Sequence, residues 1–185
     1  MLRIIAGKYR GIKLDEVMND STRPTTDKNK EMLFNILGQF FEGGVCLDLF
    51  SGSGALGIEA LSRGIDHVTF VDSNSVSLST IKKNIAKIKE IESHSFQILK
   101  KDALDFLKSS ENIKYDLILA DPPYDLDIYD SILDVINKRE ILNVGGILVL
   151  EADKSRNITY DDKHLNLIRE KSSGNTKFFI YERVE

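Results

Sequence analysis

The sequence predicts an α/β protein whose mostly parallel sheet is covered by helices on both faces. Three observations carry this expectation. Between residues 45 and 151, short apolar runs typical of buried strands alternate with amphipathic runs typical of helices. A glycine-rich segment, 52–57, follows the first of these strands. Further on, two strand-like runs are joined by a turn at 172–175, which predicts a terminal antiparallel pair.

The first residues predict a small N-terminal β-hairpin arm. Segments 2–6 and 10–14 are typical of short strands, and a polar loop at 15–25 follows them. A threonine at the end of that loop can cap the helix that comes next. The apolar stripe expected on this helix consists of Met32, Leu33, Ile36, Leu37 and Phe40.

The central part of the chain supplies the parallel sheet. The expected strands are 45–50, 67–71, 95–99, 115–120 and 145–151, and the expected helices are 54–63, 74–90, 103–109 and 128–138. The terminal pair comprises 165–170 and 177–182. Since parallel strands joined through helices run in one direction, their carboxyl ends meet at one edge, where ligands bind.

Length and composition favour one domain. A chain of 185 residues that is 42% hydrophobic can bury one substantial core. We expect a single domain, 1–185, in which a hairpin and loop at 1–26 precede a core at 27–185. No apolar run is long enough for a transmembrane helix, and the apolar start is too short for a signal peptide, so we expect a cytoplasmic protein. We also expect a monomer.

Cysteine and histidine usage predicts neither a disulfide nor a metal site. Cys46 is the single cysteine, and its place inside an apolar strand is typical of a small core residue. The histidines, His67, His94 and His164, are scattered and lack ligand spacing. We therefore expect no metal.

Charge is distributed unevenly along the chain. The net charge is −4, but the first 30 residues carry +3 and the remainder −7. A basic arm on an acidic body can contact nucleic-acid phosphates locally, with Lys8, Arg10, Lys13 and Arg23 as candidates. A solvated hairpin with ordinary surface lysines is the alternative interpretation.

The strongest chemical signal is Asp121-Pro122-Pro123-Tyr124, which directly follows the strand 115–120. An exocyclic amino group on a nucleobase is a poor nucleophile until two acceptors hold its hydrogens and free its lone pair. Asp121 and the Pro122 carbonyl can supply these acceptors, Pro123 stiffens the backbone, and Tyr124 offers a flat face for stacking. The motif predicts methylation of an exocyclic amine, with a stiff strand-ending turn as the alternative.

A second signal, Gly52-x-Gly54-x-x-Gly57, follows the strand 45–50 and predicts a nucleotide-binding loop. Glycines permit a tight turn and a close approach, and the next helix directs its free N–H groups at the ligand. The same spacing occurs in dinucleotide-binding proteins, so a nicotinamide dehydrogenase is a second interpretation. Asp48 favours a cationic ligand such as S-adenosylmethionine over a pyrophosphate. The expected cofactor-binding residues here are Asp48 and the loop residues Ser51, Gly52, Ser53 and Gly54.

Two further strand ends carry acidic residues. Asp72, followed by Ser73, ends the strand 67–71 about where an acid holds ribose hydroxyls, and Asp102, followed by Ala103, could accept from an adenine amino group. Each aspartate could instead cap the helix that follows it, and the sequence leaves both interpretations open.

These motifs resemble those of class I S-adenosylmethionine-dependent methyltransferases, and nearly the whole chain resembles the RsmD family of bacterial 16S ribosomal RNA guanine-N2 methyltransferases. The glycine loop and the proline tetrapeptide are shared with the wider superfamily. The patterns more particular to the family are Arg3-Ile4-Ile5-Ala6-Gly7, Arg10-Gly11, Lys13-Leu14, Arg23-Pro24-Thr25-Thr26-Asp27, Glu31 and Phe34-Asn35. The sequence departs from the family at Ile12 and Lys30, where relatives often carry arginine.

The resemblance implies a Rossmann-like seven-stranded fold in which 27–185 is the catalytic core. It implies that Phe50 and the loop residues 51–54 wrap the amino-acid and ribose parts of S-adenosylmethionine, that Asp72 holds the ribose and that Asp102 and Ala103 border the adenine. Thr25 and Thr26 join the expected RNA-binding set. The implied partner is 16S rRNA or a small ribosomal subunit particle, whose target base leaves its stack to be methylated.

Two other functions remain open at this stage. DNA adenine-N6 methyltransferases share the proline tetrapeptide, although this chain has no insertion large enough for an obvious target-recognition domain. A non-catalytic RNA-binding assembly factor could use the same fold.

Overall fold

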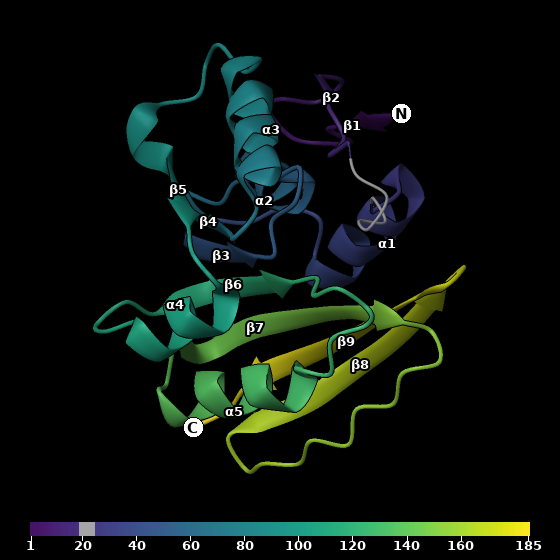
Figure 1. Cartoon of the computed structure of the whole chain (residues 1–185), viewed down its shortest axis with the longest axis vertical. Coiled ribbons are helices and arrows are strands. Elements are labelled where there is room, and N and C mark those ends of the chain that lie inside the picture. The colour runs from purple at the N-terminus through teal and green to yellow at the C-terminus, as the bar shows by residue number, and fades with distance from the viewer. Residues whose placement is uncertain (19–24) are drawn as a thin grey trace.

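The computed structural model describes residues 1–18 and 25–185 (Figure 1). The strands of its main sheet are β3 (Val45–Leu49), β4 (His67–Asp72), β5 (Phe96–Lys100), β6 (Tyr115–Ala120), β7 (Leu142–Asp153), β8 (Leu165–Ser173) and β9 (Thr176–Arg183). They lie in the order β5-β4-β3-β6-β7-β9-β8, with parallel pairing from β5 to β7 and antiparallel pairing from β7 to β8. The predicted mostly parallel sheet with a terminal antiparallel pair is confirmed.

Helices cover both faces of this sheet. The helices are α1 (Asp27–Leu37), α2 (Ala55–Ser62), α3 (Ser75–Ala86), α4 (Ala103–Ser109) and α5 (Tyr129–Lys138), with a short 3-10 helix, η1 (Ser93–Ser95). One apolar core joins α1, α2 and α3 to one face of the sheet, and a second joins α4 and α5 to the other (Figure 1). No helix in the described part of the chain is long and apolar enough to cross a membrane.

Helix α1 begins where the sequence predicts, because Thr26 caps it by accepting a hydrogen bond from the Asn29 N–H at 3.1 Å. The helix ends earlier than the apolar pattern suggests. Gly38 adopts a left-handed conformation with φ of 105° and turns the chain away. Phe40 is therefore 60% exposed, so its prediction as part of the buried stripe is wrong, and Phe34 is fully buried instead.

The N-terminal strands are shorter than the predicted segments 2–6 and 10–14. Only β1 (Leu2–Arg3) and β2 (Lys13–Leu14) form a regular antiparallel pair. The Ile4 N–H still donates to the Ile12 carbonyl, at 2.9 Å, but the N–H groups of Ile5 and Ala6 donate to the Glu59 carboxylate of α2. The Glu59 side chain thus fastens the N-terminal arm to α2.

Glu59 also organises a buried charge network. Its carboxylate lies 3.4 Å from Lys30 Nζ and 2.9 Å from Arg63 Nε, and all three side chains are at most 3% exposed. Lys30 thus serves to join α1 to α2, and it is not available to RNA. Desolvation lowers the pKa of Lys30, and the charge of Glu59 opposes that shift.

Candidate active site

The glycine loop connects β3 to α2 through several left-handed residues. Phe50, Gly52 and Gly54 have φ angles of 54°, 56° and 80°. A left-handed conformation is strained for a bulky residue such as Phe50, which indicates that its surroundings hold it there. Ser51 supplies part of that support: its buried hydroxyl accepts from the Val71 N–H at 2.9 Å, so the side chain fastens the loop to β4.

Two aspartates from neighbouring strands form hydrogen bonds to the loop and to the start of α2. Asp48 Oδ2 accepts from the Gly57 N–H in the first turn of α2, and Asp72 Oδ2 accepts from the Gly52 N–H, both at 3.0 Å. These hydrogen bonds join two neighbouring strand ends to a backbone segment that must stay open to a ligand. Both predicted acidic residues therefore lie at the loop.

The loop contains one glycine that packing requires and one that faces open space. A Cβ at Gly57 would lie 2.4 Å from Phe70 Cε1 and 2.9 Å from Asp48 Oδ2, so no other residue fits there. A Cβ at Gly52 would meet nothing within 4 Å. The backbone at Gly52 is consequently open to close approach by a bound molecule.

The structure shows which residues at the other strand ends cap the helices that follow. Asn74, and not Asp72, caps α3, because its side chain accepts from the Val76 N–H at 2.8 Å. Asp72 supports this turn through a bond from the Asn74 N–H, and neighbouring Ser73 is exposed. Asp102 does cap α4 by accepting from Asp105, and Ala103 beside it is buried.

The acceptor motif lies beside a second acid on the neighbouring strand. Ala120 of β6 pairs with Leu150 of β7, so Asp121 and Glu151 each come directly after this pair, on adjacent strands whose usual spacing is about 4.8 Å. Alternation along the strands places both on the face covered by α1, α2 and α3. Thr25 Oγ1 donates to the Glu151 carboxylate at 3.2 Å.

These carboxyl groups form an acidic cluster with Asp48. Burial raises the pKa of Asp121 well above its ordinary range, and the negative charges of Glu151 and Asp48 raise it further. Burial likewise raises the pKa of Glu151 to about 7, opposed by the hydrogen bond from Thr25. Asp48 is raised in pKa mainly by burial, against the stabilising Gly57 bond. A cationic ligand here would favour the ionised forms.

The rest of the proline tetrapeptide makes a tight exit from β6. Pro122 is buried and Pro123 exposed, and the Pro123 carbonyl accepts from the Leu126 N–H at 3.0 Å, which closes a turn. Tyr124 is half-buried on this turn. The motif is thus a stiff turn in structure, and it lies at the same sheet edge as the glycine loop.

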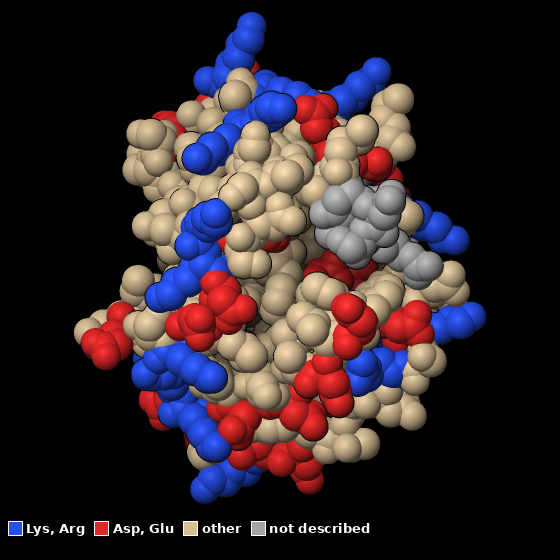
Figure 2. Space-filling view, viewed as in Figure 1, with Lys and Arg blue, Asp and Glu red and all other residues tan. Residues whose placement is uncertain are grey.

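The predicted RNA-binding residues divide into three groups. Lys8, Arg10 and Lys13 of the arm are exposed, and the Lys8 ammonium lies 5.2 Å from the centre of the Tyr9 ring. The hydroxyls of Thr25 and Thr26 are engaged, the first with Glu151 and the second as the cap of α1. Arg23 lies outside the described residues. Figure 2 shows acidic side chains gathered over α5, in the lower half of that view.

Glu151 is the site residue that sequence reasoning missed. It ends a long apolar run in β7 and is only 4% exposed. An acid that ends an apolar strand run, as Asp72 and Asp121 do nearby, is the signal that could have identified it. Its proximity to Asp121 depends on the pairing of β6 with β7, which a local pattern does not reveal.

Comparison with known proteins places this site in a family. YlbH of Bacillus subtilis is 38% identical over 184 residues, covering 98% of this chain and 99% of that protein. Ribosomal RNA small subunit methyltransferase D of Haemophilus influenzae is 32% identical over 182 residues, covering 98% and 93%. The solved structure of yhhF from Escherichia coli superposes with a TM-score of 0.83 at 29% identity, covering 99% of this chain and 98% of that one.

A family model described as Conserved hypothetical protein 95 matches residues 2–182, almost the full length of the chain. The match spans the arm, the glycine loop and the proline tetrapeptide. This chain therefore belongs to the Conserved hypothetical protein 95 family, the RsmD family that its motifs resemble.

Proposed function

We propose that this protein is an S-adenosylmethionine-dependent rRNA methyltransferase that methylates the N2 amino group of a guanine in 16S rRNA, within a small-subunit particle in the cytoplasm. The observation that carries the proposal is the meeting of Asp121 and Pro122 with the open glycine loop at one sheet edge. The name of the Haemophilus influenzae relative supports rRNA as the substrate class.

The described residues fit the proposed cofactor. Gly52 leaves open space where a side chain would stand, and Asp48 and Asp72 hold the surrounding backbone in place. The nearby carboxyl groups suit a ligand that carries positive charge. S-adenosylmethionine supplies an electrophilic methyl group on a sulfonium. We propose that 50–54 contact its amino-acid and ribose portions, that Asp72 and Ser73 border the ribose, and that Asp102 and Ala103 border the adenine.

The acceptor groups would activate the guanine amine. In the proposed mechanism, Asp121 and the Pro122 carbonyl each accept one N–H of the amino group, which frees the nitrogen lone pair for in-line attack. Pro123 keeps the turn rigid, and Tyr124 stacks on the base. The nitrogen must lose one proton when it gains the methyl group, and we propose that the Asp121 carboxylate accepts this proton.

The arm is the proposed first contact with RNA. Lys8, Arg10 and Lys13 are exposed on it, and Arg23 carries a further cation. Thr25 and Thr26 lie between this arm and the acceptor motif, so a nucleotide held at Asp121 would bring RNA close to them. We propose a monomer with residues 27–185 as the catalytic core.

The other functions lack comparable support. A DNA adenine-N6 methyltransferase would use the same tetrapeptide, but the Haemophilus influenzae relative is named as a methyltransferase of ribosomal RNA. A nicotinamide dehydrogenase has no use for two acceptors at the end of β6, and a non-catalytic assembly factor has no use for an intact acceptor motif beside an open glycine loop.

Tritiated methyl transfer tests the proposal. Small-subunit particles from cells that lack the enzyme are incubated with labelled S-adenosylmethionine, and the RNA is digested to nucleosides. We expect label in N2-methylguanosine with the wild-type protein and a strong loss of that label with Asp121→Ala. Label in N6-methyladenine of added DNA, or no transfer to particles and to RNA alike, would contradict the proposed function.

A further inference from the structure

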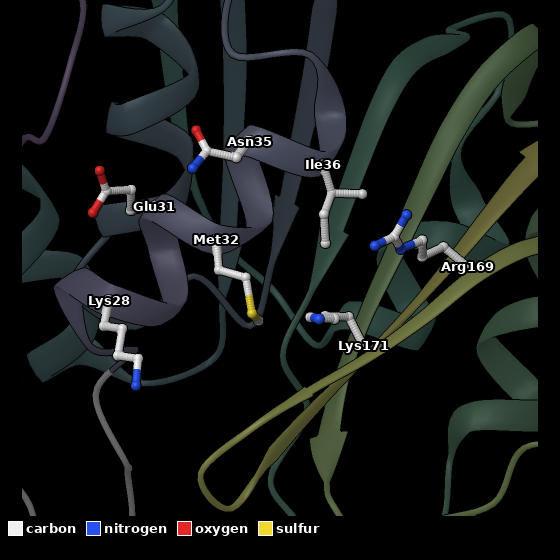
Figure 3. Close-up of a pocket in the computed structure, with 7 residues that line it drawn as sticks. All are labelled: Lys28, Glu31, Met32, Asn35, Ile36, Arg169 and Lys171. Atoms are coloured by element: carbon white, nitrogen blue, oxygen red, sulfur yellow. The ribbon is translucent and has the colours of Figure 1, made fainter.

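A groove lined by three cations lies between α1 and the edge strand β8. Its volume is about 520 Å³. The residues that line it are Lys28, Glu31, Met32, Asn35, Ile36, Arg169 and Lys171. Figure 3 shows Arg169 and Lys171 projecting from β8 toward α1, with Met32 extending from the helix into the same space. Three cations against one acid make this groove basic on a chain whose net charge is −4.

A β-bulge directs both strand cations into the groove. The register of β8 on β9 shifts between Leu167, which pairs with Tyr181, and Arg169, which pairs with Ile180. Ile180 belongs to the core of α1, α2 and α3, whereas Tyr181 belongs to the opposite core. Without the extra residue, Arg169 would pair with Phe179 and point to the face of α4 and α5. The bulge therefore places Arg169, and with it Lys171, on the face of α1.

The groove cations are available to a ligand. Lys28, Arg169 and Lys171 are all exposed, and none forms an ion pair with another residue in 1–18 or 25–185. Between them, Met32 and Ile36 are partly buried and give the groove an apolar floor. Exposed cations around an apolar floor suit phosphates joined by flat or weakly polar groups, as in a single RNA strand.

One end of the groove lies at the start of α1, next to the segment that contacts the acceptor site. Lys28 lies in the first turn of α1, two residues after the cap Thr26 and three after Thr25. Thr25 bonds to Glu151, which occupies the strand position beside Asp121. Lys28 is therefore close to the acceptor site, and an RNA strand with one base at Asp121 would have its neighbouring phosphates near Lys28. This proximity favours the RNA substrate over an acidic protein as the occupant.

We propose that the α1–β8 groove binds backbone phosphates of the RNA that flank the target nucleotide, through Lys28, Arg169 and Lys171. The inference rests on the proposed function, because it assigns this surface to the same substrate. It adds a second phosphate-binding surface to the basic arm, on the other side of α1 from the arm's contacts with Glu59. A nucleotide leaving its stack would then be held from both sides of the acceptor motif.

The test compares two doubly substituted proteins of equal charge. The groove variant is Arg169→Gln with Lys171→Gln. The control is Lys108→Gln with Lys163→Gln, which removes two exposed cations from α4 and from the loop before β8. Binding is measured with a fluorescent single-stranded RNA from 50 to 300 mM salt, and methyl transfer with small-subunit particles. Thermal melting checks that each protein folds.

The groove variant should reduce the steepness of the plot of log affinity against log salt by about 1.4, since each phosphate contact to a single strand contributes about 0.7 to the slope. Its KM for particles should rise about tenfold with kcat and cofactor binding unchanged, while the control behaves as wild type. Slopes and KM equal to those of the control would overturn the groove proposal, as would binding of an acidic peptide in preference to RNA. Failure of the wild-type protein to transfer methyl groups would instead overturn the proposed function, because the salt slopes require no transfer.

Discussion

Thr25 and Glu151 stand 126 positions apart in the chain, yet the Thr25 hydroxyl donates a hydrogen bond to the Glu151 carboxylate at 3.2 Å. This bond fastens the segment before α1 to the end of β7, beside the acceptor motif. It also gives the buried carboxylate a donor that favours its ionised form. The two adjacent threonines thus have separate structural roles, since Thr25 donates a hydrogen bond to Glu151 and Thr26 caps α1.

Glu151 should make stability depend on pH. Burial raises its pKa from 4.5 to about 7, so the protonated form is favoured in the folded protein. This contribution to stability is fully present below about pH 4.5 and is lost as the pH rises through about 7. We expect wild type to lose on the order of 1 to 3 kcal/mol relative to Glu151→Gln between pH 5 and pH 8. Urea unfolding at several pH values measures the difference, and parallel curves for the two proteins would contradict it.

Asp121 should be needed for transfer but not for cofactor binding. Asp121→Ala removes one acceptor for the guanine amine, and we expect kcat to fall by about a hundredfold or more. Asp121→Asn keeps an acceptor oxygen and should retain measurable activity. Single-turnover methyl transfer gives the rate, and a thermal shift with S-adenosylhomocysteine reports the cofactor. Full activity of the alanine variant would show that another group orients the amine.

Gly52 should be required for the cofactor, and Gly174 provides a matched control. Both glycines have left-handed φ angles, 56° and 58°, and a Cβ at either would meet nothing within 4 Å. Valine at either position costs similar backbone strain, on the order of 1 to 2 kcal/mol. S-adenosylhomocysteine at a hundredfold its Kd should stabilise wild type and Gly174→Val by about 2.7 kcal/mol, and Gly52→Val hardly at all. An equal shift in both variants would place the cofactor elsewhere.

Glu59 should be among the most sensitive positions for folding. Glu59→Ala leaves Lys30 and Arg63 buried without their carboxylate and deprives Ile5 and Ala6 of an acceptor. We expect a loss of about 3 to 5 kcal/mol in the free energy of unfolding. The exposed pair of Asp134 with Lys138 is the comparison, and Asp134→Ala should cost far less because water screens this pair. Urea denaturation measures both, and similar losses would mean that the buried network contributes little.

The order of strands and helices could be predicted from the sequence, because it depends on short-range patterns. Apolar runs of strand length, a threonine before an amphipathic helix and glycines at a loop each limit the backbone within a few residues. The glycine loop and Asp121-Pro122-Pro123-Tyr124 were located for the same reason. Because parallel strands joined through helices all run in one direction, both motifs are then expected at the carboxyl edge of the sheet.

The partners of individual polar side chains were decided only by tertiary structure. Glu151 lies beside Asp121 because β7 pairs with β6, and it contacts Thr25 because α1 packs against the same face of the sheet. Lys30 is buried because Glu59 reaches it from α2, and a bulge in β8 turns Arg169 toward α1. Each outcome depends on which distant segments pack together. The local sequence around a polar residue is the same whether that residue caps a helix, forms an ion pair or binds a ligand. Only the packing of elements distant in the chain decides between these roles.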